Sequence, residues 1–350
     1  MAETTRMVRK RFSARTAVSR PVRLALALLL TGWMVSACAT KLYPDFPVVR
    51  AEMARFEPDE DRFVTFDGES LGLTVWGDEI DDPEYVVVGV HGMNDYANAF
   101  HMAAPWWAER GVRTYAYDQR GFGRSYGRGR WQNEEAMRED LRTAVRLARE
   151  RHPDAVLSVV GISMGGAVAM STFGGDNPPE VDRLILSGPG LRGWGAIPVV
   201  QRVALSISTR VRPGWVVVPP KFVKIEPSDN IEMLHRSWAD PLMLRDNRID
   251  QVHGVVSLME TAHKRAANLP ERTMFLYGAK DIVIPESGVR RTSKRLPDHV
   301  RTAYYENGYH MLMRDLQAEN VWMDQLAFMM DPDAPLPSGA PGLPWMDKNT

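Results

Sequence analysis

Residues 155–173 read AVLSVVGISMGGAVAMSTF. The first eight residues are apolar and rich in β-branched side chains, which predicts a strand buried on both faces. The last eight are small and apolar, as in a helix that packs closely on a sheet. The motif GISMG at 161–165 lies between them, and a G-x-S-x-G turn from strand to helix holds its serine in a strained conformation with the hydroxyl projecting from the sheet. We therefore predict that Ser163 is a nucleophile and that the Met164 amide faces a developing oxyanion. The alternative is that this segment is a plain strand-to-helix turn with no catalytic role.

Other apolar runs that predict strands alternate with amphipathic helical patterns on both sides of this stretch. This alternation predicts an α/β fold with a mostly parallel central sheet and helices on both faces. The expected strands are 85–90, 112–117, 181–186, 273–277 and 301–306, after a hairpin at 62–76, and the expected helices are 98–110, 133–151, 249–265 and 317–330.

A serine hydroxyl is a weak nucleophile that needs a base within hydrogen-bond reach, and the base needs an orienting carboxylate. Asp281 follows the expected strand 273–277, and His310 lies in a loop after the strand 301–306. The chain order serine, acid, histidine suits a G-x-S-x-G site. Asp331 and Asp333 are rival acids, but they follow His310 and break that order. An aspartate that merely caps a turn is the alternative for Asp281.

A second amide for the oxyanion is expected from Met93, which follows His91-Gly92 at the end of the strand 85–90. Residues 118–125, DQRGFGRS, follow another strand, and their two glycines favour a structural turn over a catalytic role for Asp118. The sequence has no metal-ligand cluster and no phosphate-binding glycine loop.

These motifs, HGM at 91–93, DQRGFGRS at 118–125, GISMG at 161–165, and then Asp281 and Tyr309-His310, resemble the α/β-hydrolase superfamily. Within it they are most similar to the monoacylglycerol lipase, lysophospholipase and serine aminopeptidase-like group, which are serine hydrolases with a small cap. The resemblance implies an α/β-hydrolase fold, a triad of Ser163, Asp281 and His310, oxyanion amides of Met93 and Met164, and no cofactor or metal. A serine nucleophile and the lack of proline after His-Gly distinguish the chain from epoxide hydrolases and dehalogenases.

The expected core covers 61–190 and 271–330, and 191–270 is too long for a simple crossover, so we predict an inserted cap there. The cap contains apolar residues at helical spacing. They either cover an acyl chain and exclude water, or simply pack on the core. These residues include Val199, Val203, Leu205 and Ile207.

The N-terminus is typical of an export signal. Residues 1–23 are basic, and 24–35 form an apolar block shorter than the roughly 20 residues that span a membrane. The block ends in VSAC at 35–38, which resembles the lipobox of bacterial lipoproteins, and Cys38 is the only cysteine. Cleavage after 1–37 and lipidation of Cys38 would anchor the chain in the cell envelope. Ala39, in place of aspartate, favours the outer membrane. We expect a tether at 38–60 and a loose proline-rich tail at 331–350.

The formal net charge of −1 over 350 residues gives no reason to expect nucleic acid as a partner. The predicted partners are a lipid or ester substrate and, through Cys38, a membrane. The sequence thus predicts an exported, lipid-anchored serine hydrolase of monoacylglycerols or lysophospholipids. A short-chain esterase, a thioesterase, a peptidase or a non-enzymatic envelope protein with this fold are the alternatives, and the sequence leaves the acyl length, head group and oligomeric state open.

Overall fold

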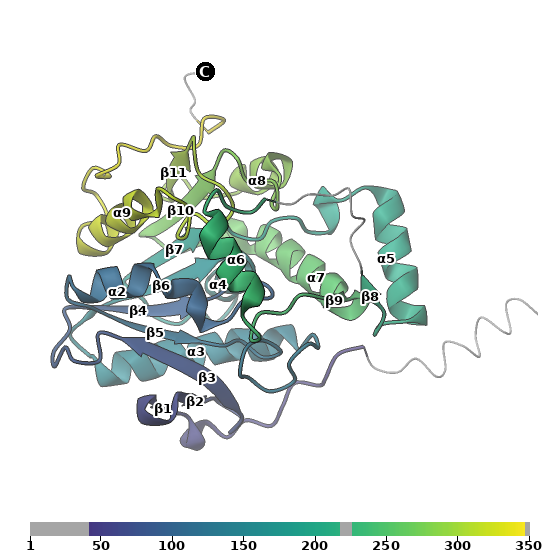
Figure 1. Cartoon of the computed structure of the whole chain (residues 1–350), viewed down its shortest axis with the longest axis horizontal. Coiled ribbons are helices and arrows are strands. Elements are labelled where there is room, and N and C mark those ends of the chain that lie inside the picture. The colour runs from purple at the N-terminus through teal and green to yellow at the C-terminus, as the bar shows by residue number, and fades with distance from the viewer. Residues whose placement is uncertain (1–41, 218–225, 347–350) are drawn as a thin grey trace, which may run out of the picture. The chain divides into compact units, whose positions relative to one another are not determined.

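The computed structural model of the chain describes residues 42–217 and 226–346 (Figure 1). Its centre is a nine-stranded sheet with the order β1-β2-β3-β5-β4-β6-β7-β10-β11. The strands from β5 to β11 run parallel, while β1, β2 and β3 add an antiparallel edge. The strands are β1 Arg55–Glu57, β2 Arg62–Val64, β3 Ser70–Trp76, β4 Tyr85–Val90, β5 Val112–Tyr117, β6 Val156–Ile162, β7 Arg183–Ser187, β10 Thr273–Gly278 and β11 Arg301–Tyr305.

The sheet is mostly parallel and covered on both faces, so the predicted α/β fold with a mostly parallel central sheet is confirmed. The central strands β4 and β6 are almost wholly buried, which explains why their sequences are continuous apolar runs instead of alternating patterns. The predicted hairpin at 62–76 forms from β2 and β3, and Gly68 takes the left-handed conformation at its turn.

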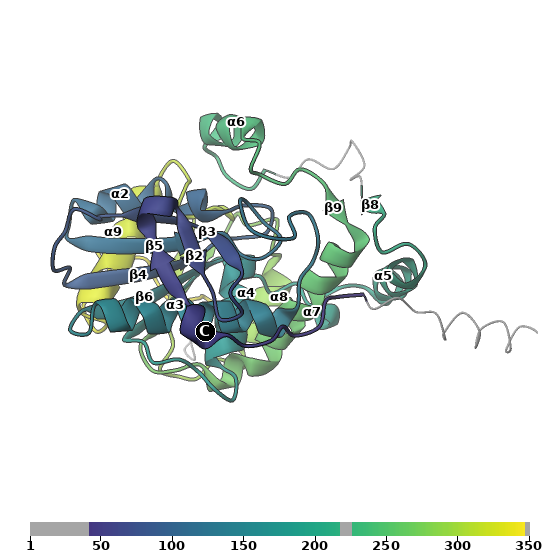
Figure 2. The same ribbon diagram turned by 90° about the horizontal axis from the view of Figure 1, so that it is seen from below.

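Helices cover the two faces of the sheet in two apolar layers (Figures 1 and 2). One layer contains α3 (Glu134–Arg151), α4 (Met164–Phe173), the inner half of α7 (Ile249–Arg265) and α8 (Glu286–Ser293). The opposite layer contains α2 (Ala103–Ala108) and α9 (Ala318–Met330). The start of α3 is fixed by Asn133, whose side chain accepts hydrogen bonds from two amides of the first turn.

The insertion between β7 and β10 forms the cap, at the right and front of Figure 1. It contains α5 (Val199–Val211), α6 (Ile231–Ala239) and a two-stranded ribbon of β8 (Val216–Val217) with β9 (Asn247–Arg248). The second half of α7 packs on α4 with fully buried Leu258 and Ala262. That half therefore contributes to the apolar core, and the cap boundary expected at residue 270 stays a prediction.

The two expected terminal segments are more ordered than their composition suggests. Residues 55–57 of the predicted tether form the edge strand β1. The prediction of a loose tail is wrong for 331–346, because Leu343 is buried and the Trp345 ring packs edge-on against Tyr277 and Tyr304. Proline removes amide donors but leaves apolar side chains free to pack.

The predicted export signal and Cys38 lie outside the described residues. Across 42–217 and 226–346, every helix is too short or too polar to cross a bilayer.

Candidate active site

Ser163 lies on the sharp turn from β6 to α4. Its backbone has φ 51° and ψ −115°, a strained region for a residue with a side chain. The flanking glycines permit this turn: a Cβ on Gly165 would lie 2.1 Å from the Val90 carbonyl oxygen, and one on Gly161 would lie 2.8 Å from that of Gly165. The local structure is the elbow that the motif predicts.

Three side chains meet at the carboxyl ends of the parallel strands. Ser163 follows β6, Asp281 follows β10, and His310 follows β11. The His310 Nε2 atom lies 2.9 Å from the Ser163 Oγ atom, and its Nδ1 atom lies 2.8 Å from Asp281 Oδ2. Because a carboxylate accepts, Nδ1 is the donor there, and Nε2 is left to accept the serine proton.

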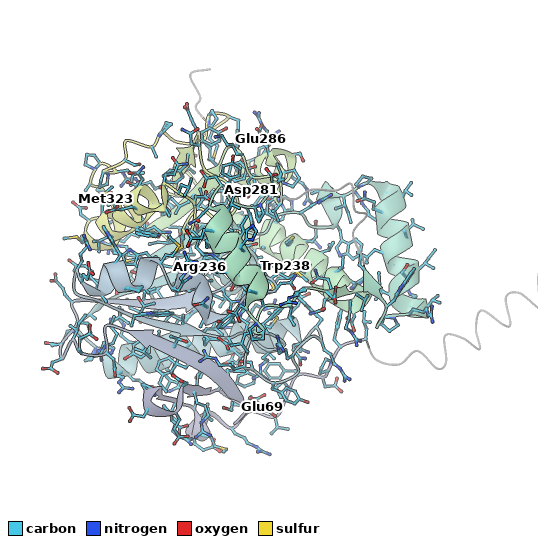
Figure 3. All side chains as sticks on the ribbon, viewed as in Figure 1. Glu69, Arg236, Trp238, Asp281, Glu286 and Met323 are labelled. Carbon is cyan, nitrogen blue, oxygen red and sulfur yellow. The ribbon has the colours of Figure 1, made fainter. Side chains whose placement is uncertain are left out.

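Asp281 is held in place by backbone donors. Its Oδ1 atom accepts hydrogen bonds of 2.8 Å from the amides of both Val283 and Ile284. The carboxylate is almost fully buried, while Glu286, which begins α8 five residues later, lies at the surface (Figure 3). The rival Asp331 caps its own turn by accepting from the Asp333 amide.

Gly188 is a site residue that sequence reasoning missed. A Cβ there would lie 3.7 Å from His310 Nδ1 and 3.9 Å from Asp281 Oδ2, and the residue has φ 51°. The left-handed φ is what favours glycine here, and the residue lies within van der Waals distance of both side chains. The signal available in the sequence was the run SGPG at 187–190, directly after a predicted strand.

The loop after β4 lies against the serine. A Cβ on Gly92 would be only 3.2 Å from Ser163 Cβ, so the following Met93 amide is close to the elbow. None of the turn and loop hydrogen bonds in the described residues uses the N–H of Met93 or Met164. The two predicted oxyanion amides are therefore brought to one place and left available.

His91 fixes the peptide that carries the Met93 amide. Its Nδ1 donates to the Gly92 carbonyl at 2.7 Å, and its Nε2 accepts from the Gln119 amide at 2.8 Å. Both bonds require the neutral ring, and burial lowers the pKa of His91, which favours that form. His91 thereby orients the amide without touching Ser163.

Asp118 contacts structural groups and none of the three triad side chains. It accepts from the Ala97 amide at 2.9 Å and pairs with Arg124. Burial alone would raise the pKa of Asp118, but these donors outweigh it and lower the pKa below its usual value. A Cβ on Gly72 or Gly123 would lie 2.4 Å from this carboxylate, so glycine is required on both sides of it.

Helix α6 is tied to the core at both ends and carries Arg236 and Trp238 (Figure 3). At its start, Asn230 donates to the Arg314 carbonyl at 3.0 Å in the loop that follows His310. At its end, the Tyr96 hydroxyl donates to Asp240 at 2.7 Å from the loop that follows Met93. The helix therefore bridges two loops: the histidine loop after β11, which carries His310, and the oxyanion loop after β4, which carries Met93.

An apolar cavity of about 480 Å3 lies between the cap and the core. Three of its lining residues lie near triad residues: the Met259 side chain packs on Gly190, whose amide donates to the Ser163 carbonyl, and the amides of Val283 and Ile284 donate to Asp281. The lining also includes residues of α5 and α7, namely Gln201, Ala204, Leu205, Ser208, Val252, Val255 and Val256.

Fold and site define a serine hydrolase of the α/β-hydrolase fold. The serine aminopeptidase, S33 family profile matches residues 81–317, and the chain belongs to this family. The chain is 29% identical to a monoacylglycerol lipase of Mycolicibacterium smegmatis over 277 residues, which is 77% of this chain and 96% of that protein. The chain is an esterase- and lipase-like enzyme.

Solved structures share the fold. A soluble variant of monoglyceride lipase from Saccharomyces cerevisiae, in complex with a substrate analogue, superposes with a TM-score of 0.64 at 16% identity, over 83% of this chain and 97% of that one. The monoacylglycerol lipase of Paleococcus ferrophilus gives a TM-score of 0.61 at 22% identity, over 74% and 98%.

Proposed function

We propose that this enzyme hydrolyses carboxylic esters of glycerolipids, namely monoacylglycerols or lysophospholipids, through an acyl-enzyme on Ser163. The observation that carries the proposal is the hydrogen-bonded chain from Asp281 through His310 to Ser163. It supplies a nucleophile, a base and an orienting acid in one geometry.

In the first half-reaction, Ser163 Oγ attacks the ester carbonyl carbon while His310 Nε2 takes the hydroxyl proton. The amides of Met93 and Met164 stabilise the tetrahedral oxyanion. His310 then returns the proton to the departing glycerol oxygen, and the acyl group stays on Ser163. Water, deprotonated by His310, releases the fatty acid and restores the serine.

The apolar cavity supports a long acyl chain as the substrate group. Among the described residues that line it, Arg192 is the one charged side chain, so a hydrocarbon chain fits the cavity better than the charged amino terminus of a peptide. The M. smegmatis relative is a monoacylglycerol lipase, which agrees with this choice.

We also propose that the chain is exported and anchored in a bacterial envelope membrane, the outer membrane by preference, by lipid on Cys38. The support is the sequence alone: the basic start, the short apolar block and the VSAC motif at 35–38. Mass spectrometry of the N-terminal peptide from membranes tests it, and an unmodified Cys38 would contradict it.

An ester panel tests the substrate proposal. Wild-type protein and Ser163→Ala are assayed on monoacylglycerols and lysophospholipids of rising chain length, short esters, thioesters and aminoacyl amides. The proposal predicts the highest kcat/KM on long monoacylglycerols or lysophospholipids, and loss of it in Ser163→Ala. Preference for short esters would make the enzyme a short-chain esterase, while preference for thioesters or for aminoacyl amides would make it a thioesterase or a peptidase.

A further inference from the structure

The segment of the cap that leads into α6 is hydrogen-bonded along the histidine loop, and α6 lies at the centre of Figure 1. Four successive cap residues, 227–230, each form a hydrogen bond with that loop. The Pro227 carbonyl accepts from the Met311 amide at 2.9 Å, Ser228 donates to Asp315 at 2.7 Å, Asp229 accepts from the Leu316 amide at 2.9 Å, and Asn230 donates to the Arg314 carbonyl at 3.0 Å. The segment and the loop therefore form one connected unit.

Asp315 lies at the centre of these contacts. One of its oxygens accepts from the Ser228 hydroxyl, and the other accepts from the Tyr309 amide at 2.7 Å. Tyr309 immediately precedes His310 in the chain. The Ser228 oxygen also accepts from the Asn230 amide at 3.1 Å, which leaves its proton for Asp315. Ser228 thus fixes the carboxylate that fixes the backbone next to the histidine.

Burial makes this bridge depend on all of its members. Asp315 and Ser228 are each only 1% exposed. Burial raises the pKa of Asp315, and the hydrogen bonds from Ser228 and the Tyr309 amide oppose that rise. Water cannot readily replace a donor that is lost from so buried a site, so removal of one member leaves its partner unsatisfied.

The cap thereby fixes the backbone on both sides of His310. The Tyr309 amide is bound by Asp315, and the Met311 amide is bound directly by the Pro227 carbonyl. The ring between them has its Nε2 atom 2.9 Å from Ser163 Oγ. Proton transfer needs such a distance, and a displacement of about 1 Å can lower a rate by about a hundredfold.

We propose that Ser228 and Asp315 are positioning residues for His310, through which the cap aligns the base with Ser163. The cap then completes the catalytic geometry in addition to covering the cavity. Because the bridge acts on proton transfer, it serves every ester that the triad hydrolyses. The proposal therefore does not rest on the choice of a lipid substrate, and a preference of the wild type for short esters would contradict that choice alone.

The test compares two leaving groups. The kcat/KM is measured for the nitrophenyl ester and for the glycerol ester of the same short acid, in the full chain and in Ser228→Ala, Asp315→Ala and the double variant. Nitrophenolate departs without a proton, whereas the glycerol oxygen needs the proton that His310 returns. The ratio of the two kcat/KM values does not depend on how much of a variant is folded. Ser237→Ala is the matched control, because the Ser237 hydroxyl contacts the Met233 sulfur within α6 itself.

The bridge predicts a loss that depends on the leaving group. For the glycerol ester, kcat/KM should fall by about tenfold in Ser228→Ala and by up to about a hundredfold in Asp315→Ala, with a smaller fall for the nitrophenyl ester. The double variant should match Asp315→Ala, since Ser228 acts only through Asp315. Equal losses on both esters, or losses that multiply in the double variant, would overturn the proposal, as would wild-type values in Ser228→Ala.

A conservative variant and hydrogen exchange supply independent readouts. Asp315→Asn should keep a ratio near that of the wild type, because the amide oxygen can accept from Tyr309 and the amide nitrogen can donate to the Ser228 oxygen. A ratio as low as that of Asp315→Ala would contradict the bridge. In Ser228→Ala, amide hydrogen exchange in the peptide 306–316 should be faster than in the wild type and in Ser237→Ala. Unchanged exchange there would show that the cap does not fix the loop through Ser228.

Discussion

Arg314 donates a hydrogen bond of 2.5 Å to Asp95, and both side chains are buried. Arg314 lies four residues after His310, and Asp95 lies two residues after Met93, so this ion pair joins the histidine loop to the oxyanion loop. The other Asp95 oxygen accepts from the Tyr96 amide at 2.9 Å, and the Arg314 carbonyl accepts from Asn230 of the cap. The pair thus fixes the loop of His310, the loop of Met93 and the cap relative to one another.

Removal of Arg314 is expected to be costly. Arg314→Met leaves Asp95 buried without its cation, so the free energy of unfolding should fall by about 3 kcal/mol and kcat should fall with little change in KM. In Asp95→Asn/Arg314→Met no buried charge is left, and stability should largely return while kcat stays low, because the loops are no longer joined. Denaturant unfolding and ester kinetics measure both. Full recovery of kcat in the double variant would show that the pair contributes only stability.

Replacements of His91 test its part in orienting the Met93 amide. His91→Asn keeps a side-chain N–H near the place of Nδ1, whereas His91→Gln puts its amide nearer to Nε2. We expect His91→Gln to lower kcat by about tenfold, and His91→Asn to lower kcat by a smaller factor. Both effects are smaller than the roughly hundredfold loss of kcat that follows removal of an oxyanion donor. Equal kcat values in two folded variants would argue against the orienting role.

Asp118→Asn should show a pH-dependent loss of stability. The pKa of Asp118 is lowered in the folded state, so its ionised form stabilises the fold above the unfolded pKa of about 4, and that contribution is lost as the pH falls through the folded pKa. At neutral pH the free energy of unfolding of the variant should be about 2 kcal/mol lower than that of the wild type, because a neutral amide takes the place of the charged carboxylate that accepts these hydrogen bonds. The gap to wild type should narrow below about pH 4. Urea unfolding from pH 7 to pH 3 measures this gap, and a constant one would contradict the account.

The cavity can be narrowed from the cap without touching the triad. Ala204→Phe and Ser208→Phe add a ring on the lining side of α5, while Ser206→Phe adds one on the same helix outside the lining. If the cavity holds the acyl chain, loss of contact with about two methylenes lowers kcat/KM for long esters by about tenfold and leaves short esters unchanged. The Ser206→Phe control should behave as wild type. The same chain-length profile in all three variants would place the acyl chain elsewhere.

The sequence predicted the meeting of Ser163, Asp281 and His310 because each follows a strand, and parallel strands end at one edge of a sheet. It also predicted α7 and β6 closely, α7 from apolar residues at helical spacing and β6 from a continuous apolar run. These signals are local to each segment, and the fold brings the segments together.

Other features depend on contacts between distant segments. Nothing local links Asp95 to Arg314, which are 219 residues apart. The prolines of 331–346 suggested a loose tail, but Leu343 and Trp345 find apolar partners only once the sheet has formed. In α5, the spacing of Val203 and Ile207 indicated an apolar helix face without showing whether it is covered, and the structure leaves both side chains exposed.

The central claim is that Ser163, activated by His310, becomes acylated. The direct measurement is incubation of the full chain with a fluorophosphonate, followed by mass spectrometry of the peptide that contains residue 163, with Ser163→Ala and His310→Ala in parallel. The account predicts stoichiometric modification of Ser163 in the wild type, slow modification in His310→Ala, and none in Ser163→Ala, which should also lose ester hydrolysis. An unmodified Ser163 in folded wild-type protein, or full hydrolysis by Ser163→Ala, would contradict it.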